Sequence, residues 1–109
     1  MITLKQIKQN GGATLDYQGN AINYKRGYQV SKRDLAIIPT YKLRKTQLIE
    51  MLAEIPEGAN LGIWIDNGKA YIDQSVKVND KAIALRVGKA LKQLAIWDWK
   101  AGRAIACRP

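Results

Sequence analysis

The sequence contains no histidine, no phenylalanine and only one cysteine, Cys107, among 109 residues. Without histidine, the chain cannot form a Ser-His or Cys-His nucleophile pair or an imidazole metal site. Cys107 is predicted to be a packing residue, because free cysteine usually behaves as a small hydrophobe. Walker A and Gly-x-Gly-x-x-Gly motifs are also missing. We therefore expect a non-enzymatic protein with no catalytic residues, no metal and no cofactor.

Long apolar runs are missing as well. None approaches the ~20 residues that span a bilayer, and the N-terminus lacks the apolar segment of a signal peptide. A single cysteine fits a reducing compartment, because one cysteine forms no internal disulfide. The length of 109 residues corresponds to one domain. We predict a cytoplasmic, single-domain protein with no membrane partner.

Negative charge is scarce: nine acidic residues stand against 18 basic ones, for a net charge of +9. The excess is uneven, because residues 1–45 hold nine basic residues and two acidic ones, whereas residues 46–109 hold nine and seven. A positive field of this kind favours polyanions and speeds encounter with them. The alternative is that the charge only keeps the protein soluble.

Much of this positive charge lies in one short stretch. Its cations are interleaved with three tyrosines and opposed only by Asp34, a pattern typical of proteins that bind a phosphate backbone with exposed bases. We predict nucleic-acid binding by Lys25, Arg26, Lys32, Arg33, Lys42, Arg44 and Lys45. A basic helix face adds Arg86, Lys89 and Lys92. No helix-turn-helix, zinc-finger or RNA-recognition signature accompanies them, so we expect little sequence specificity.

The most regular pattern lies between residues 60 and 78. Asn67-Gly68 tolerates the two positive φ angles of a type I′ turn, which predicts a β-hairpin with Trp64 opposite Tyr71. One hairpin face is expected to be core and holds Leu61, Ile63, Ile65, Ala70 and Ile72. The other face holds Trp64, Asp66, Lys69, Tyr71 and Asp73.

The remaining segments predict helices after Thr3, from Thr46 to Ile55, and from Asn79 or Asp80 to about Leu94. The apolar stripe of the last helix is Ile83, Ala84, Val87, Ala90, Leu91 and Leu94. Strands are expected at residues 13–17, 21–24, 28–30, 95–98 and 103–107, and residues 31–46 are predicted to be a loop with one short element. The fold class is α+β: one domain with a mostly antiparallel sheet of hairpins and about three helices packed on it.

The outward face of the hairpin leaves two questions open. Asp66 and Asp73 are the best candidates for a catalytic or metal-binding pair, but Tyr71 lies between them and Lys69 opposes Asp66. We therefore favour a surface ion pair and a solvated aspartate. Trp64 and Tyr71 have three interpretations: packing beneath another element, anchoring of a protein partner, or a stacking platform for bases. We predict one of the first two, because the nearby aspartates repel phosphate.

Several stretches of the amino-acid sequence resemble those of a group of known proteins. The stretches L-G-I-W-I-D-N-G-K-A-Y-I-D-Q-S (61–75) and K-Q-L-A-I-W-D-W (92–99) are similar to small proteins of bacteriophages and other mobile elements, mostly of Gram-positive bacteria. N-G-G-A-T-L (10–15) and G-Y-Q-V-S (27–31) are similar too. No activity is established for that group. The resemblance implies an accessory role in a phage or prokaryotic setting.

Two functions follow as hypotheses. The first is binding of nucleic acid, or of a nucleoprotein complex, through the basic stretch and the last helix. The second is counter-defence inhibition of the anti-CRISPR or anti-restriction type, in which Trp64 and Tyr71 anchor the protein on a host nuclease. A metal-assisted nuclease built on Asp66 and Asp73 ranks third.

Overall fold

The hairpin predicted around Asn67-Gly68 forms the centre of the sheet. In the computed structural model, which describes residues 2–107, β3 (Asn60–Asp66) and β4 (Lys69–Val78) pair antiparallel, with Trp64 opposite Tyr71. Asn67 and Gly68 have φ angles of 49° and 74°, as a type I′ turn requires. The predicted turn and register are therefore confirmed.

Six strands make one antiparallel sheet in the order β1-β3-β4-β2-β5-β6. Besides β3 and β4, the sheet contains β1 (Gly12–Leu15), β2 (Tyr28–Pro39), β5 (Ala95–Asp98) and β6 (Arg103–Ala106), with β1 and β6 at its two edges. β2 pairs with β4 along its whole length, but with β5 only at Tyr28 and Gln29. On that side, no strand of the described residues pairs with β2 beyond Gln29.

The described residues form three α-helices and one 3-10 turn: α1 (Leu4–Asn10), η1 (Thr40–Lys42), α2 (Lys45–Glu54) and α3 (Lys81–Ala90). α1 precedes the first strand, and the others lie between strands. Thr3 caps α1 in a capping box with Gln6, and Asp80 caps α3 by accepting a hydrogen bond from the Ile83 backbone N–H. The cap of α2 is Arg44 rather than the predicted Thr46. With these helices and an antiparallel sheet, the predicted α+β class is confirmed.

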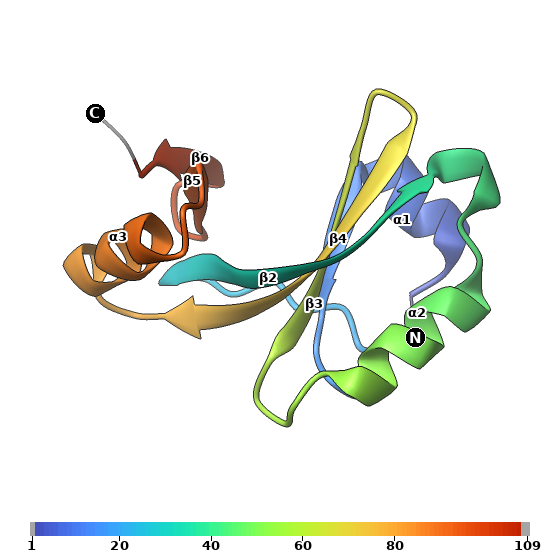
Figure 1. Cartoon of the computed structure of the whole chain (residues 1–109), viewed down its shortest axis with the longest axis horizontal. Helices are drawn as coiled ribbons and strands as arrows, with labels where there is room; N and C mark the ends of the chain where they lie inside the picture. The colour runs from blue at the N-terminus through green and yellow to red at the C-terminus, as the bar shows by residue number, and fades with distance from the viewer. Residues whose placement is uncertain (1, 108–109) are drawn as a thin grey trace.

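All helices pack on one face of the sheet. In β4 the alternate residues Ala70, Ile72 and Val76 contact the core beneath α1 and α2, and Val78, on the same face, contacts the smaller core beneath α3. Figure 1 shows α1 and α2 at one end of the long β2 and α3 with β5 and β6 at the other. Leu61, Ile63 and Ile72 are at most 5% exposed, so the predicted core face of the hairpin is confirmed.

The segment from residue 31 to 46 was predicted to be a loop, and this prediction was wrong. Most of it belongs to β2, which has two bulges, between Ser31 and Arg33 and between Asp34 and Ala36. Each bulge inserts an extra residue and shifts the alternation of side chains, so the period of two is lost from the sequence. Pro39 ends the strand, where the loss of one N–H donor is tolerated.

The last helix is shorter than predicted. α3 ends at Ala90 rather than at Leu94, and Lys92 adopts a left-handed φ of 59°. Leu91 and Leu94, beyond the end of the helix, are exposed, with Leu94 at 75%. Within the helix Ile83 is exposed as well, whereas Ala84 is buried. Gly88 contributes to the same contact, because a Cβ there would overlap the Cys107 sulfur and crowd Ile96. Cys107 is buried in this second core, as predicted for a packing residue.

Candidate functional site

The sheet face opposite the helices divides into a covered half and an open half. In β4 this face carries Tyr71, Asp73, Ser75 and Lys77, because side chains alternate along the strand. At the Ser75 end it is closed by a buried polar network centred on Gln29. The two halves therefore differ in solvent access and in what they can bind.

The covered half is held together by the side-chain amide of Gln29. Its Nε2 donates to Asn60 Oδ1 and Ser75 Oγ, both at 2.8 Å, and its Oε1 accepts from Trp99 Nε1 at 3.1 Å. Tyr24 stands edge-on to Trp99 at 5.5 Å between ring centroids. All these polar groups are paired, so this half is a packed structural region.

The open half presents an apolar surface. Trp64 is 64% exposed and Ile37, opposite Tyr71 in the register, is 62% exposed. The Trp64 and Tyr71 rings lie 6.0 Å apart. Trp64 does not pack beneath another element, so the packing interpretation is wrong, and the exposure of its side chain is compatible with the role of a partner anchor. That role stays a prediction.

Asp73 is not the solvated residue predicted from the sequence. Burial raises its pKa from 3.8 to about 6; the Ser31 hydroxyl opposes this rise and Asp34 adds to it. Asp34 lies directly opposite Asp73 on β2, whereas Asp66 lies opposite Lys69, further along the hairpin. The acidic pair of this face is thus Asp34 and Asp73, not Asp66 and Asp73. Sequence reasoning missed Asp34 because its segment was predicted to be a loop.

The ten predicted nucleic-acid-binding residues are all exposed. They do not form one cluster, however. Lys25 and Arg26 precede β2 and Lys42 follows it, so the whole length of the 12-residue strand lies between them. Figure 1 shows β2 running across the molecule from the end near α3 to the end near α1. The predicted stretch is therefore divided into residues before β2 (Lys25, Arg26), on β2 (Lys32, Arg33) and after β2 (Lys42, Arg44, Lys45). Arg86 and Lys89 on α3, with Lys92 just after it, form a separate group.

Two of these cations also have structural contacts. Arg33 Nε donates to Gln74 Oε1 at 2.7 Å. Arg44 donates from Nη1 to the backbone oxygens of Tyr41 and Leu43, at 3.0 Å and 3.2 Å. Substituting either residue would disturb local structure as well as charge, so they are poor choices for testing binding alone.

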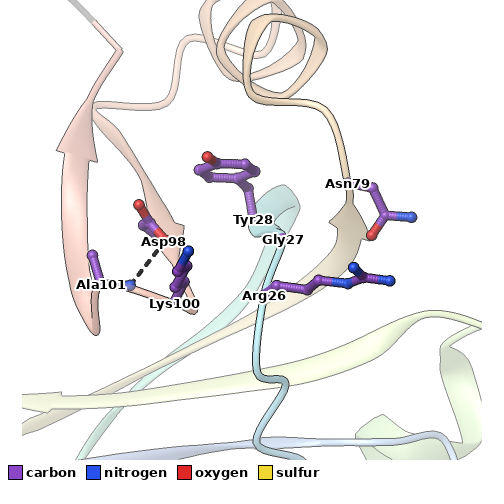
Figure 2. A pocket seen from close by; sticks show the side chains of 7 residues that line it. All are labelled: Arg26, Gly27, Tyr28, Asn79, Asp98, Lys100 and Ala101. Atoms are coloured by element: carbon purple, nitrogen blue, oxygen red, sulfur yellow. Dashed lines mark hydrogen bonds between the residues drawn. The ribbon is translucent and has the colours of Figure 1, made fainter.

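An open cleft of about 640 Å³ lies at the start of β2. It is lined by Arg26, Gly27, Tyr28, Asn79, Asp98, Lys100 and Ala101. Figure 2 shows Lys100 and Asp98 on one side of the Tyr28 ring, and Arg26 and Asn79 on the other. Asp98 Oδ1 accepts the Ala101 backbone N–H at 3.1 Å. The cleft thus combines two exposed cations, an amide and an aromatic ring, which are groups that bind phosphate and stack on bases, with one carboxylate, Asp98, which opposes phosphate.

Lys100 and Asn79 were not predicted as site residues. They are far from Arg26 in the sequence, and only the pairing of β2 with β4 and β5 brings the three segments together. Tyr28 pairs with Asp98, which brings the β5–β6 turn with Lys100 close to the loop that carries Arg26. Tyr28 also pairs with Val78, which brings Asn79 close to the same loop. No local pattern in the sequence indicates this meeting.

No family model, curated protein or solved structure matches the chain. Within residues 2–107, no group of three His, Cys, Asp or Glu residues is placed to hold a metal ion. No helix in that part of the chain is long and apolar enough to cross a membrane.

Proposed function

We propose that this protein is a non-enzymatic, cytoplasmic nucleic-acid-binding protein, and that a polyanion lies along β2 from the Arg26–Lys100 cleft to the cations at Lys42 and Lys45. The observation that supports this is the exposure of every cation of the 25–45 stretch, two of them on β2 itself and the others in the segments that precede and follow this strand. One edge of that strand has no partner strand beyond Gln29 among residues 2–107, so a ligand can approach it.

The length and chemistry of this surface fit an extended ligand. The longest dimension of the molecule is 36 Å. A nucleic-acid strand has phosphates at roughly 3.4 Å rise per base pair, so at most about ten phosphates lie along this surface. At one end, Tyr28 lies between Arg26 and Lys100, where a base can stack while the cations contact neighbouring phosphates. We place this activity in a bacteriophage or other mobile element, on the resemblance of residues 61–75 and 92–99.

Binding to duplex DNA is expected to depend steeply on salt. If about five phosphates are neutralised, log K should fall against log salt with a slope near −4 to −5, because each neutralised phosphate releases about 0.9 counterions. Titrations of labelled DNA by fluorescence anisotropy at several salt concentrations measure this slope. If no binding occurs at low salt with protein in large excess, the proposal is rejected.

The second prediction locates the surface. Changing Lys32, Lys42 and Lys45 together to Glu should weaken DNA binding by more than about tenfold and make the salt slope shallower by about 0.9 for each phosphate that is no longer neutralised. These lysines are exposed, so the midpoint of thermal unfolding should hardly change. The measurements are the same anisotropy titrations, with circular dichroism melting curves.

The matched control is the change of Arg86, Lys89 and Lys92 to Glu on α3. It alters the net charge by the same amount at a different place, so it separates a located surface from a general attraction of positive charge. A smaller reduction in affinity than in the β2 variant supports the proposed surface. An equal or larger reduction would move the site to α3.

A second candidate function is counter-defence inhibition by contact with a host nuclease. The observation in its favour is the exposure of Trp64 and Ile37, at 64% and 62%, on either side of Tyr71 in the sheet, because contact surfaces of this type are usually anchored by aromatic residues. Trp64→Ala should then abolish inhibition of the nuclease and leave DNA binding by the β2 surface unchanged. Retained inhibition by Trp64→Ala contradicts this second candidate.

A further inference from the structure

Two aspartates, Asp34 and Asp73, lie side by side on the open half of the sheet, and their proximity is unfavourable for folding. Asp34 and Asp73 are direct cross-strand partners, and like charges in this position destabilise a sheet. The Asp73 carboxylate lies over Gly62 on β3, where a Cβ would overlap it. Unfavourable arrangements of this kind are expected mainly at functional sites.

The backbone of β2 is shaped around the same pair. One bulge precedes Asp34 and another follows it, and bulges re-aim side chains beside functional sites. A pocket of about 230 Å³ lies at the second bulge. It is lined by Asp34, Ala36, Ile37, Tyr71, Ile72 and Asp73. Sites for small-molecule ligands usually span roughly 300–1,000 Å³, so this pocket suits a single side chain better than a whole cofactor.

The residues around the pocket determine which kind of side chain from a ligand it can bind. Two carboxyl groups at one end favour a cation and disfavour the phosphates of nucleic acid. Ile37 and Tyr71 line the pocket, and Trp64 packs beside Tyr71 with most of its surface exposed. Apolar and aromatic groups hold the aliphatic stem of a long basic side chain and attract its charged end.

We propose that this pocket receives an arginine side chain of a protein partner, with its guanidinium group between Asp34 and Asp73 and its stem against Ile37 and Tyr71. Arginine fits better than lysine, because its planar group forms parallel hydrogen bonds to carboxylates and stacks on aromatic rings. This inference does not depend on nucleic-acid binding along β2. It specifies the partner's chemistry for the second candidate function.

The probe is the peptide N-acetyl-Leu-Arg-Leu-amide, and its control is the same peptide with citrulline, which keeps the shape but lacks the charge. Two-dimensional NMR of the labelled protein should show saturable shifts at the Trp64 indole N–H and at the backbone amides of Asp34 and Asp73. We expect a Kd of about 1 mM for the arginine peptide and binding at least about tenfold weaker for the citrulline peptide.

Two variants test the residues. Asp34→Asn should weaken binding of the arginine peptide by at least about tenfold, because one carboxylate partner is removed. The matched control is Asp66→Asn, which removes an exposed carboxylate from the same sheet face and should leave the Kd unchanged. Both substitutions are on the surface, and a chemical-shift map of each free variant verifies that it is folded.

Four outcomes would overturn the proposal. Two concern the peptides: no saturable shift up to about 10 mM, or equal shifts with the citrulline peptide. The third is binding of Ca²⁺ or Mg²⁺ alone at Asp34 and Asp73 that is tighter than binding of the peptide, which would identify a metal site. The fourth is a concentration-dependent dimer that Asp34→Asn dissociates, which would identify a second copy of the chain as the occupant.

Discussion

Replacing Ile72 with alanine is expected to lower the free energy of unfolding by roughly 2–5 kcal/mol. Ile72 is 1% exposed and lies on β4, at the centre of the main core, with Ile63 as its partner on β3. Alanine would remove buried methyl groups and leave a cavity that the surrounding strands and helices fill only in part. Urea unfolding followed by circular dichroism measures the change.

The matched control for Ile72 is Trp64→Ala on the neighbouring strand. Trp64 points away from the helices and is 64% exposed, so its removal should change the free energy of unfolding by less than about 1 kcal/mol, the contribution of a cross-strand pair with Tyr71. A larger destabilisation by Trp64→Ala than by Ile72→Ala would mean that the two faces of the sheet are inverted. The anchor proposed for a protein partner would then be a core residue.

Replacing Asp73 with asparagine is expected to stabilise the protein above pH 6 by up to about 3 kcal/mol. The pKa of Asp73 rises from 3.8 to about 6 on folding, mainly through burial, and each pKa unit corresponds to about 1.4 kcal/mol. Asparagine has nearly the same shape and cannot ionise, so the cost of a buried charge disappears. The measurement is the free energy of unfolding of both proteins from about pH 4 to about pH 8.

The sign of this pH dependence follows from proton binding. Between pH 3.8 and about 6 the folded protein holds a proton on Asp73 that the unfolded chain has released, so stability falls as pH rises through this window. Below pH 3.8 the stability of the wild-type protein and of Asp73→Asn should depend on pH in the same way, because Asp73 is then protonated in both the folded and the unfolded wild-type chain. Asp66→Asn is the control and should leave this slope in place, since Asp66 is exposed. The contrary result is an equal change in the free energy of unfolding over this window for the wild-type protein and for Asp73→Asn. It would show that Asp73 is not buried.

The residues of the candidate sites differ in how far the sequence predicts that they lie together. Trp64 and Tyr71 were predicted as a cross-strand pair, because both belong to one hairpin and its turn sets their register. Asp34 was not connected with Asp73, because 38 intervening residues and two bulges separate the pattern of β2 from that of β4. The Arg26–Lys100 cleft was missed for the same reason: its residues come from three segments that meet only in the folded sheet.

What the sequence determined by itself is therefore local. Asn67-Gly68 set a turn, Thr3 and Asp80 set helix starts, and the lack of histidine excluded imidazole chemistry, because each of these depends on residues within a few positions or on composition alone. The tertiary structure decided which charges lie together. The long strand β2 separates the cations before it from those after it, and the pairing of β2 with β4 places Asp34 opposite Asp73. Strand pairing over long sequence distances depends on the whole core, and no short pattern records it.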